Sequence, residues 1–301
     1  MTRRVWLLFL AMCLIWGLPY LLIRVSVRAI TPAELVFGRT AIGAAVLLPL
    51  AARRGQLRVV LPHWRPLLAY TAVEIAIPWL LLSDAERHIS SSLSGLLVAA
   101  VPLVGTALAW ATGFRQVLGP RQLTGLLIGL LGVGAVLGFD LGTMTPLAGV
   151  EMAVVIICYA TGPQILSRRL AHLPGLGVVA FSLVMGAVAY LPVAVWQHPR
   201  AVPSGEVMAS VAVLGLVCTA LAFVLFFELI RRIGAVRATV ITYVNPAVAV
   251  ALGVVLLHES FTAGTAIGFG LILVGSALAT RVSPPPRRDG QPTLGSVGAE
   301  P

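Results

Sequence analysis

The sequence predicts an all-α polytopic membrane protein in which ten transmembrane helices form two inverted five-helix repeats. Its composition indicates a membrane protein, because 58% of the 301 residues are hydrophobic and 11% are charged, whereas a soluble domain carries roughly a quarter charged residues. The mean hydropathy is +0.98. The apolar residues are gathered into ten segments, and the last five segments repeat the first five at a constant spacing.

Each apolar segment spans about 18 to 23 residues, which is long enough to cross a hydrocarbon layer of roughly 30 Å as a helix. Helices are expected because backbone polar groups cannot stay unpaired in lipid, and the segments lack the alternation of β-barrel strands. Short connections with turn-forming residues, such as Gly119-Pro120, separate them. The expected helices cover residues 5–23, 33–51, 66–83, 90–112, 120–138, 147–166, 174–195, 207–227, 236–257 and 262–281.

The second group of five segments repeats the first at an offset of 143 residues. Because five is an odd number, the second copy must enter the membrane from the opposite side, and inverted repeats are typical of alternating-access transporters. We therefore expect a first repeat over residues 5–138, a second over 147–281 and a disordered cytoplasmic tail over 282–301. The offset relates Pro49 to Pro192, Gly43 to Gly186, Gly125 to Gly268 and Gly132 to Gly275.

All 21 basic residues are arginines, and their positions predict the orientation. With the N-terminus in the cytoplasm, fifteen arginines lie on the inner side and four on the outer side, and Arg39 and Arg237 lie at membrane depth. This asymmetry follows the positive-inside rule and predicts a multi-pass protein of the inner (plasma) membrane with both termini cytoplasmic. The net charge of +10 is spread over inner loops and the tail, so it suits anionic lipids and not nucleic acid.

The sequence contains no motif for a metal site, a disulfide or a nucleotide-binding loop, so we expect no cofactor. Cys13, Cys158 and Cys218 lie singly in apolar segments, without metal-ligand or disulfide spacing, and a Walker loop requires a lysine that the chain lacks. A membrane-embedded enzyme acting on lipid-linked substrates is the alternative function, and it needs clustered His, Asp or Glu. The cluster at 84–88 is better explained as a solvated outer turn. A channel is a weaker alternative because no ring of like charges is present.

Several local features, together with the repeat over residues 5–281, carry a family resemblance. The chain resembles the drug/metabolite transporter superfamily and, within it, the EamA-type exporters. One departure is Gln116, because the family usually has Glu at the end of the fourth segment. The matching features are Trp16-Gly17 late in the first segment, Arg39 in the second, Pro102 in the fourth, Asn245-Pro246 in the ninth and His258-Glu259 at its end.

The resemblance implies a secondary transporter, and often an exporter, that moves small organic metabolites or drugs. Alternating access around a central cavity between the two repeats is the mechanism that the repeat itself predicts. The small-molecule substrate and the lipid bilayer are the expected partners, and a proton is the coupling ion that we consider. The resemblance implies no particular substrate.

Glu74 and Arg39 are the two charged residues expected at membrane depth in the first repeat. Glu74 lies about 12 Å from the inner end of its segment at 1.5 Å per residue, and an acid at such depth normally faces protein or water. It is a candidate for proton coupling, for contact with a cationic substrate group, or for a structural contact. The depths of the two residues differ by only about 6 Å, so an ion pair between adjacent helices is one interpretation.

Other polar residues could line the cavity or serve packing alone. Tyr243 and Asn245 lie in the middle of the ninth segment, where Pro246 removes a backbone hydrogen bond and frees a carbonyl group. Trp16 and Tyr20 share one face of the first helix, and Gln164 lies near the corresponding place of the sixth. Each of these is also consistent with a kink, with packing or with an interfacial aromatic belt.

A last group of residues is expected to be architectural. Glu259 is expected to cap the tenth helix, because carboxylates are favoured at helix N-termini. Gly125 and Gly268 provide small faces for close helix packing, and Pro102 and Pro246 shape the fourth and ninth helices.

Overall fold

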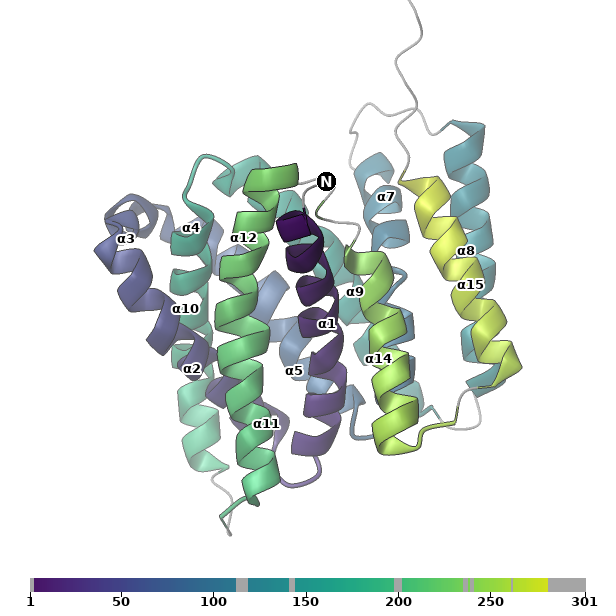
Figure 1. Ribbon diagram of the computed structural model, residues 1–301, viewed down its shortest axis with the longest axis horizontal. Helices are drawn as coiled ribbons and strands as arrows, with labels where there is room; N and C mark the ends of the chain where they lie inside the picture. Colours follow the sequence, from purple (N-terminus) through teal and green to yellow (C-terminus); the bar gives the residue numbers. More distant parts are fainter. Residues whose placement is uncertain are drawn as a thin grey trace, which may run out of the picture.

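The computed structural model describes residues 3–111, 119–140, 144–197, 202–234, 238, 241–260 and 262–280, and it confirms the predicted all-helical fold (Figure 1). Gln116 and the expected tail, 282–301, lie outside the described residues. The first two spans of the first half are α1 (Arg3–Ser26) and α2 (Pro32–Arg53). The third span is a run of α3 (Gln56–Val60), η1 (Leu61–His63), α4 (Trp64–Thr71), η2 (Ala72–Ala76) and α5 (Ile77–Ala85). The fourth joins α6 (Ser91–Val98) to α7 (Val101–Ala111), and the fifth is α8 (Pro120–Asp140).

The second half has the same order of spans. They are α9 (Pro146–Ile165) with η3 (Leu166–Leu170), α10 (Gly175–Trp196), a run of α11 (Gly205–Gly215), η4 (Leu216–Leu221) and α12 (Ala222–Ile233), then α14 (Ile241–Leu257) and α15 (Ala263–Ala279). Among the described residues, seven of these spans are long and apolar enough to cross a membrane, and α14 and α15 are shorter apolar helices.

The third span begins earlier than the sequence predicted, so part of the expected connection 52–65 is helical. The helix α3 starts at Gln56 because its side chains have a place to pack. Val60 is fully buried in a cluster with Leu67, Leu170 and Val178, whereas its neighbour Val59 is exposed. The short helix α3 therefore presents one face to α10 and leaves the other uncovered.

The packing of the helices follows the internal repeat. The helix α8 packs along α15, and α2 packs along α10, so each of these pairs joins a helix to its own repeat counterpart. The α1–α14 contact has its counterpart in α7–α9, and the α5–α9 contact has its counterpart in α1–α12. Contacts between the halves therefore dominate the interior, and the α8–α15 pair stands at one side of the bundle (Figure 1).

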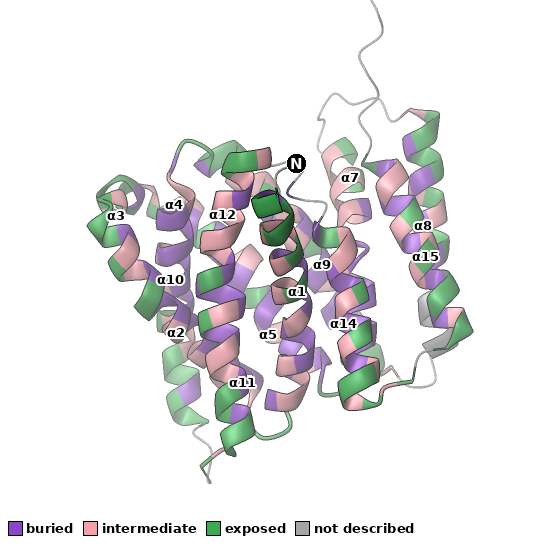
Figure 2. Ribbon diagram, in the orientation of Figure 1, coloured by how far each residue is buried: buried purple, intermediate pink, exposed green. Residues whose placement is uncertain are grey.

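Many large apolar side chains cover the outside of the bundle. Leu130, Leu131, Val188 and Trp196 are each more than 60% exposed, and exposed surface alternates with buried stripes along the outer helices (Figure 2). A soluble monomer rarely leaves such a continuous apolar surface uncovered. The surface is suited to lipid, in agreement with a multi-pass membrane protein.

The bundle has two ends, which we call the terminal end and the hairpin end. The terminal end holds the start of α1 and the end of α15, at the top of Figure 1. The hairpin end holds the connections 27–31, 86–90 and 258–262. Hydroxyl side chains cap every described helix that starts at the hairpin end, because each accepts a hydrogen bond from a backbone N–H of the first turn. These caps are Thr31, Ser90, Thr145, Ser204 and Thr262.

Candidate functional site

Two π-helical turns interrupt the spans at equivalent places in the two halves. The turn η2 lies in the third span and η4 lies in the eighth, and the offset of 143 maps 72–76 onto 215–219. π-Helical turns are rare and occur frequently at functional sites. Here η2 carries Glu74 and η4 carries Thr219, so both turns place a polar side chain inside the bundle.

Arg39 lies on α2 and is 8% exposed. Its Nε donates a hydrogen bond to the Thr219 hydroxyl at 2.9 Å. Its guanidinium carbon lies 3.7 Å from the centroid of the Trp79 ring, which is a cation–π contact. The cation is thus held by a hydroxyl of the second half and by an aromatic ring of the first half.

The ion pair that similar depth suggested between Arg39 and Glu74 is wrong for this structure. The ion pairs found among the described residues join Asp84 to Arg87 and Glu228 to two arginines of α12. Depth alone could not predict the pairing, because the direction of each side chain around its helix also decides it. Arg39 points toward η4 and Trp79 instead.

Glu74 faces α9 of the second half. Its carboxylate lies directly against Gly162, where a Cβ atom would collide with it. One carboxylate oxygen is buried and accepts no hydrogen bond from any residue that the structure describes. A glycine at this place therefore leaves room for the acid without supplying it with a partner.

Two tyrosines lie near these charges. Tyr159 on α9 lies within electrostatic reach of both Arg39 and Glu74, and Tyr20 on α1 lies within reach of Arg39. We call Arg39, Glu74, Tyr20, Tyr159, Trp79 and Thr219 the central polar cluster. It draws on α1, α2 and the third span of the first half, and on α9 and η4 of the second.

Three members of the cluster, Trp79, Tyr159 and Thr219, were not predicted as site residues. A signal for Tyr159 was present, because the offset of 143 relates it to Trp16, which was predicted. Thr219 carried no such signal, because its counterpart Ala76 is apolar. Because the two halves differ at this place, the repeat could not predict Thr219 as a site residue.

The hydrogen bonds and ring contacts of the other expected site residues are with residues outside this cluster. The Trp16 ring packs against Phe226, with centroids 4.6 Å apart. The Tyr243 hydroxyl bonds with Thr280 at 2.7 Å near the terminal end. Gln164 donates to its own helix and accepts from Arg168 at 3.3 Å.

Asn245 is buried between α14 and α1. With its amide nitrogen turned toward two carbonyl oxygens, it donates to Cys13 at 3.2 Å and to Ile241 at 3.0 Å. The Cβ of a residue replacing Gly17 would approach the Asn245 carbonyl oxygen to 3.0 Å. In this arrangement the amide joins two helices.

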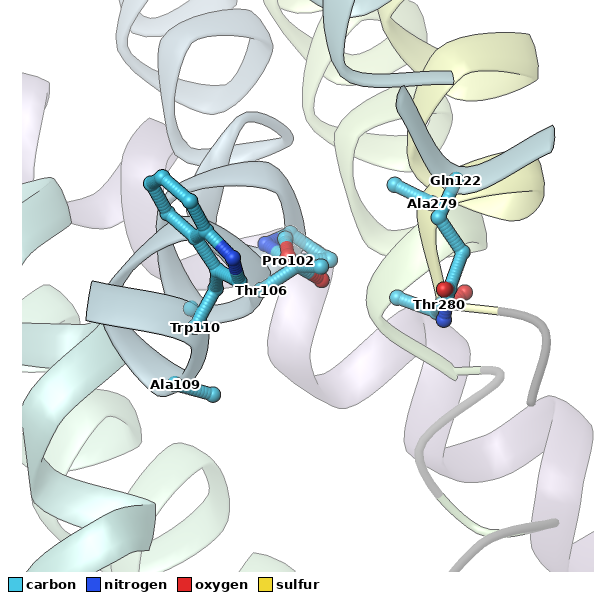
Figure 3. Close-up of a pocket in the computed structure, with 8 residues that line it drawn as sticks. Pro102, Thr106, Ala109, Trp110, Gln122, Ala279 and Thr280 are labelled. Atoms are coloured by element: carbon cyan, nitrogen blue, oxygen red, sulfur yellow. Dashed lines mark hydrogen bonds between the residues drawn. The ribbon is translucent and has the colours of Figure 1, made fainter. Parts of the chain in front are cut away.

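A cavity of about 290 Å³ lies between α7, α8 and α15 (Figure 3). The fourth span is interrupted at Ala99 and Ala100 just before Pro102, and the Ser276 hydroxyl of α15 donates to the Ala99 carbonyl oxygen at 3.2 Å. Trp110 and Thr106 lie on one side of the cavity and Gln122 and Thr280 on the other. Its lining includes Pro102 but neither of the central charges.

Close glycine packing holds α8 against α15. A Cβ on Gly125 would lie 2.8 Å from the Gly275 carbonyl oxygen, and one on Gly132 would lie 2.8 Å from the Gly268 carbonyl oxygen. Pro246 is buried in α14 beside Gly95 of α6. These residues bring backbones into contact.

Glu259 does not cap the tenth helix, which corrects the expectation from the sequence. Thr262 caps that helix. Glu259 reaches across to the first half and accepts hydrogen bonds from the N–H groups of Ser91 at 2.8 Å and Ser92 at 2.9 Å. It also accepts from both serine hydroxyls, at 3.0 Å and 2.6 Å. Glu259 binds the start of α6 because four hydrogen-bond donors are available there, although α15 is closer to it in the sequence.

The 84–88 turn is only partly the solvated turn that was expected. Asp84 and Arg87 form an ion pair at 3.0 Å near solvent, but Glu86 between them is fully buried. Both Glu86 carboxylate oxygens accept no hydrogen bond from described residues. Glu86 lies at the end of its helix, where Arg24 bonds to its backbone carbonyl oxygen and Glu259 of the second half is within electrostatic reach.

An all-helical, membrane-spanning fold with inverted repeats and a buried polar cluster between them defines a membrane transporter of small molecules. A sequence model of the EamA-like transporter family matches residues 3–138 and 149–281. The chain therefore belongs to the EamA-like transporter family. It is a multi-pass inner membrane transporter, and the alternative of a membrane-embedded enzyme is set aside.

Relatives of known name agree with this assignment. The chain is 26% identical over 278 residues to the "Uncharacterized inner membrane transporter YedA" of Escherichia coli K12, covering 90% of this chain and 88% of that protein. It is 28% identical over 291 residues to the "Probable terminal-alkyne amino-acid exporter" of Streptantibioticus cattleyicolor, covering 93% and 94%. A solved crystal structure with 24% identity matches with a TM-score of 0.66 over 93% of this chain and 97% of that chain, which shows the same fold.

Proposed function

We propose that the protein is a secondary exporter of a small zwitterionic solute of the amino-acid class. It works by alternating access between a first repeat, residues 5–138, and a second, residues 147–281. The observation that carries the proposal is a pair of opposite charges in the central polar cluster that do not pair with each other: Arg39, which is buried, and Glu74, which has one buried carboxylate oxygen without a partner.

Unpaired charges inside a membrane protein are costly, so they are retained where they serve a pathway or a ligand. A carboxylate of the solute would pair with the Arg39 guanidinium, whose planar fork suits such a group. An ammonium group of the solute would pair with the buried oxygen of Glu74. The aromatic faces of Trp79 and Tyr159 would lie beside the solute. A molecule with one charge of each sign satisfies both residues at once.

The partners of the two charges support the alternating-access part of the proposal. Arg39 of the first half bonds to Thr219 of the second, and Glu74 of the first half lies against Gly162 of the second. Rocking of one repeat against the other would therefore change the surroundings of both charges. Such motion around a fixed site is typical of transporters with inverted repeats.

The class of solute and the outward direction have support from one relative. The Streptantibioticus cattleyicolor protein is named as a probable exporter of an amino acid. The name describes that protein, and the zwitterion chemistry of the central polar cluster is an independent reason to test the same class here. A proton that competes with the ammonium group for Glu74 would couple export to a pH gradient.

Counterflow in proteoliposomes tests the proposal. Liposomes are loaded with one unlabelled amino acid at a time, and uptake of the same labelled amino acid is followed. We expect at least one amino acid to accumulate transiently with the parent protein. Arg39→Met and Glu74→Gln should each reduce the initial rate at least about tenfold, since each removes a charge-assisted contact worth about 1.5–3 kcal/mol.

The matched control is Glu228→Gln, which removes a partly exposed carboxylate paired to Arg231 and Arg232. It should keep the parent rate. Failure of every common amino acid to show counterflow would overturn the solute class. Full activity of Arg39→Met with a transported amino acid would overturn the role of the cluster.

A further inference from the structure

A second group of charged residues lies at the hairpin end, apart from the central polar cluster. Glu259 of the second half is bound by four donors from Ser91 and Ser92 of the first half. Gly253 of α14 makes room for this contact, because a Cβ there would collide with the Glu259 carboxylate and with the Ser92 hydroxyl. We call Glu259, Ser91 and Ser92 the latch, since they join the two halves across this end.

The backbone directly after α14 directs the Glu259 side chain toward α6. His258 adopts a positive φ of 54°, a conformation that is unusual for a residue other than glycine. The Glu259 N–H bonds back to the Gly253 carbonyl oxygen at 3.1 Å. The turn therefore ends α14 abruptly and points the next side chain toward α6.

Glu86 lies beside the latch and is fully buried. The groups that face it are Arg24 and Tyr20 from α1, Ser94 from α6 and Glu259 from the hairpin. Arg24 bonds to the Glu86 backbone carbonyl oxygen, and the Ser94 hydroxyl donates to the Ser90 carbonyl oxygen at 3.2 Å. The carboxylate itself is left without a hydrogen bond from the described residues.

On the same turn, the neighbours of Glu86 do not neutralise it. Asp84 and Arg87 pair with each other, and His88 is exposed. A buried carboxylate with no donor and a second carboxylate nearby is costly when ionised. The same side chain costs less to bury when it carries a proton, because the neutral form loses less solvation.

The pKa values of the two acids move in opposite directions. Burial raises the pKa of Glu86 well above its usual range, and the Glu259 carboxylate raises it further, while Arg24 lowers it less. Burial also raises the pKa of Glu259, but the hydrogen bonds from Ser92 and Ser91 together outweigh burial and hold it below its usual value. The surroundings of the closed latch therefore favour a proton on Glu86 over one on Glu259.

We propose that Glu86 is a proton-binding site that controls the closure of the hairpin end. The protonated side chain fits beside the closed latch, and its ionisation favours the release of Glu259 from Ser91 and Ser92. The role of Glu86 rests on the proposed function in one respect, because closure of this end is one step of the alternating-access cycle. In the orientation that the arginine positions predict, the hairpin end faces the outside of the cell, so Glu86 responds to the external pH.

The direction of the pH effect follows from linkage. The closed latch raises the affinity of Glu86 for a proton, so proton binding stabilises the closed arrangement. This stabilisation is fully present below the pKa that Glu86 has when the latch is open. It is lost as the pH rises toward the higher pKa of the closed state. Between these two values, the ratio of open to closed molecules rises up to about tenfold for each pH unit.

Distance measurements between spin labels test this without any substrate. One label is placed at His88→Cys in the first half and the other at Ser260→Cys in the hairpin, since both positions are exposed. The three buried native cysteines are replaced by alanine. Double electron–electron resonance is then recorded in lipid nanodiscs from pH 5 to pH 9. We expect the shorter distance at low pH and a growing population of the longer distance at high pH.

Variants identify the group that titrates. Glu86→Gln and Glu86→Leu both mimic the neutral side chain, so both should keep the shorter distance at every pH. The matched control is Glu206→Gln, which removes an exposed carboxylate at the same end and should behave as the parent. A parent distribution that does not change with pH would overturn the proposal. So would a pH dependence in either Glu86 variant equal to that of the parent. Because the readout needs no solute, neither result depends on the outcome of counterflow.

Discussion

The glycine contact between α8 and α15 gives a prediction whose size can be worked from the structure. A Cβ on Gly132 would lie 2.7 Å from the Ile272 nitrogen and 2.8 Å from the Gly268 carbonyl oxygen, whereas ordinary contact begins at 3.4 Å. Gly132→Ala must therefore push the two helices apart by several tenths of an ångström. Overpacking of this kind costs about 1–3 kcal/mol, and the gain in helix propensity offsets about 1 kcal/mol of it.

The matched control lies two residues away on the same helix. No described atom lies within 4 Å of the Cβ position of Gly134, so Gly134→Ala should be neutral or stabilising by up to about 1 kcal/mol. Thermal unfolding in detergent measures both variants, and each kcal/mol corresponds to about 2–4 °C. Gly132→Ala should melt below the parent and Gly134→Ala at or above it. Equal melting temperatures for the two variants would refute the close approach of these helices.

Three other expectations can be checked directly. Thr219→Val removes the hydroxyl that accepts the guanidinium N–H, so counterflow should slow about tenfold or more. The control is Thr161→Val, which removes a hydroxyl that bonds within its own helix at 2.7 Å, and it should leave the counterflow rate unchanged. Glu74→Gln should raise the half-saturating solute concentration at least about tenfold, and the remaining exchange should no longer accelerate with a pH gradient. Reporters fused after residue 55 and at residue 202 should lie on opposite sides of the membrane, and the same side for both would contradict the inverted repeat.

The helices and their repeat could be predicted because they depend on local composition and on spacing. An apolar run of membrane length must be helical in lipid, and the offset of 143 is visible in Gly125 and Gly268. The π-helical turns η2 and η4 could not be predicted, because they depend on how packed neighbours accommodate one extra residue per turn. Their presence decides which way Glu74 and Thr219 point.

The partners of charged residues were the least predictable part. Glu259 is close in sequence to α15 but binds Ser91 and Ser92, 168 and 167 residues away. Glu86 belongs to a charged turn, which suggested that it would be solvated, yet it is fully buried within reach of Glu259 from the other half. In both cases the second half supplies the surroundings of a residue of the first half, or the reverse. Such contacts follow from tertiary packing and leave no local pattern in the sequence.

Binding of the solute between Arg39 and Glu74 can be measured directly with two native cysteines. Cys218 lies within electrostatic reach of Arg39, and Cys158 lies within reach of Glu74, whereas Cys13 lies elsewhere on α1 beside Asn245. Alkylation of each cysteine by N-ethylmaleimide is measured in single-cysteine proteins, with and without an amino acid that shows counterflow. Binding in the cluster predicts that the solute slows alkylation of Cys218 and Cys158 and leaves Cys13 unchanged. Unchanged rates at both cysteines, with a solute that the protein transports, would contradict the account.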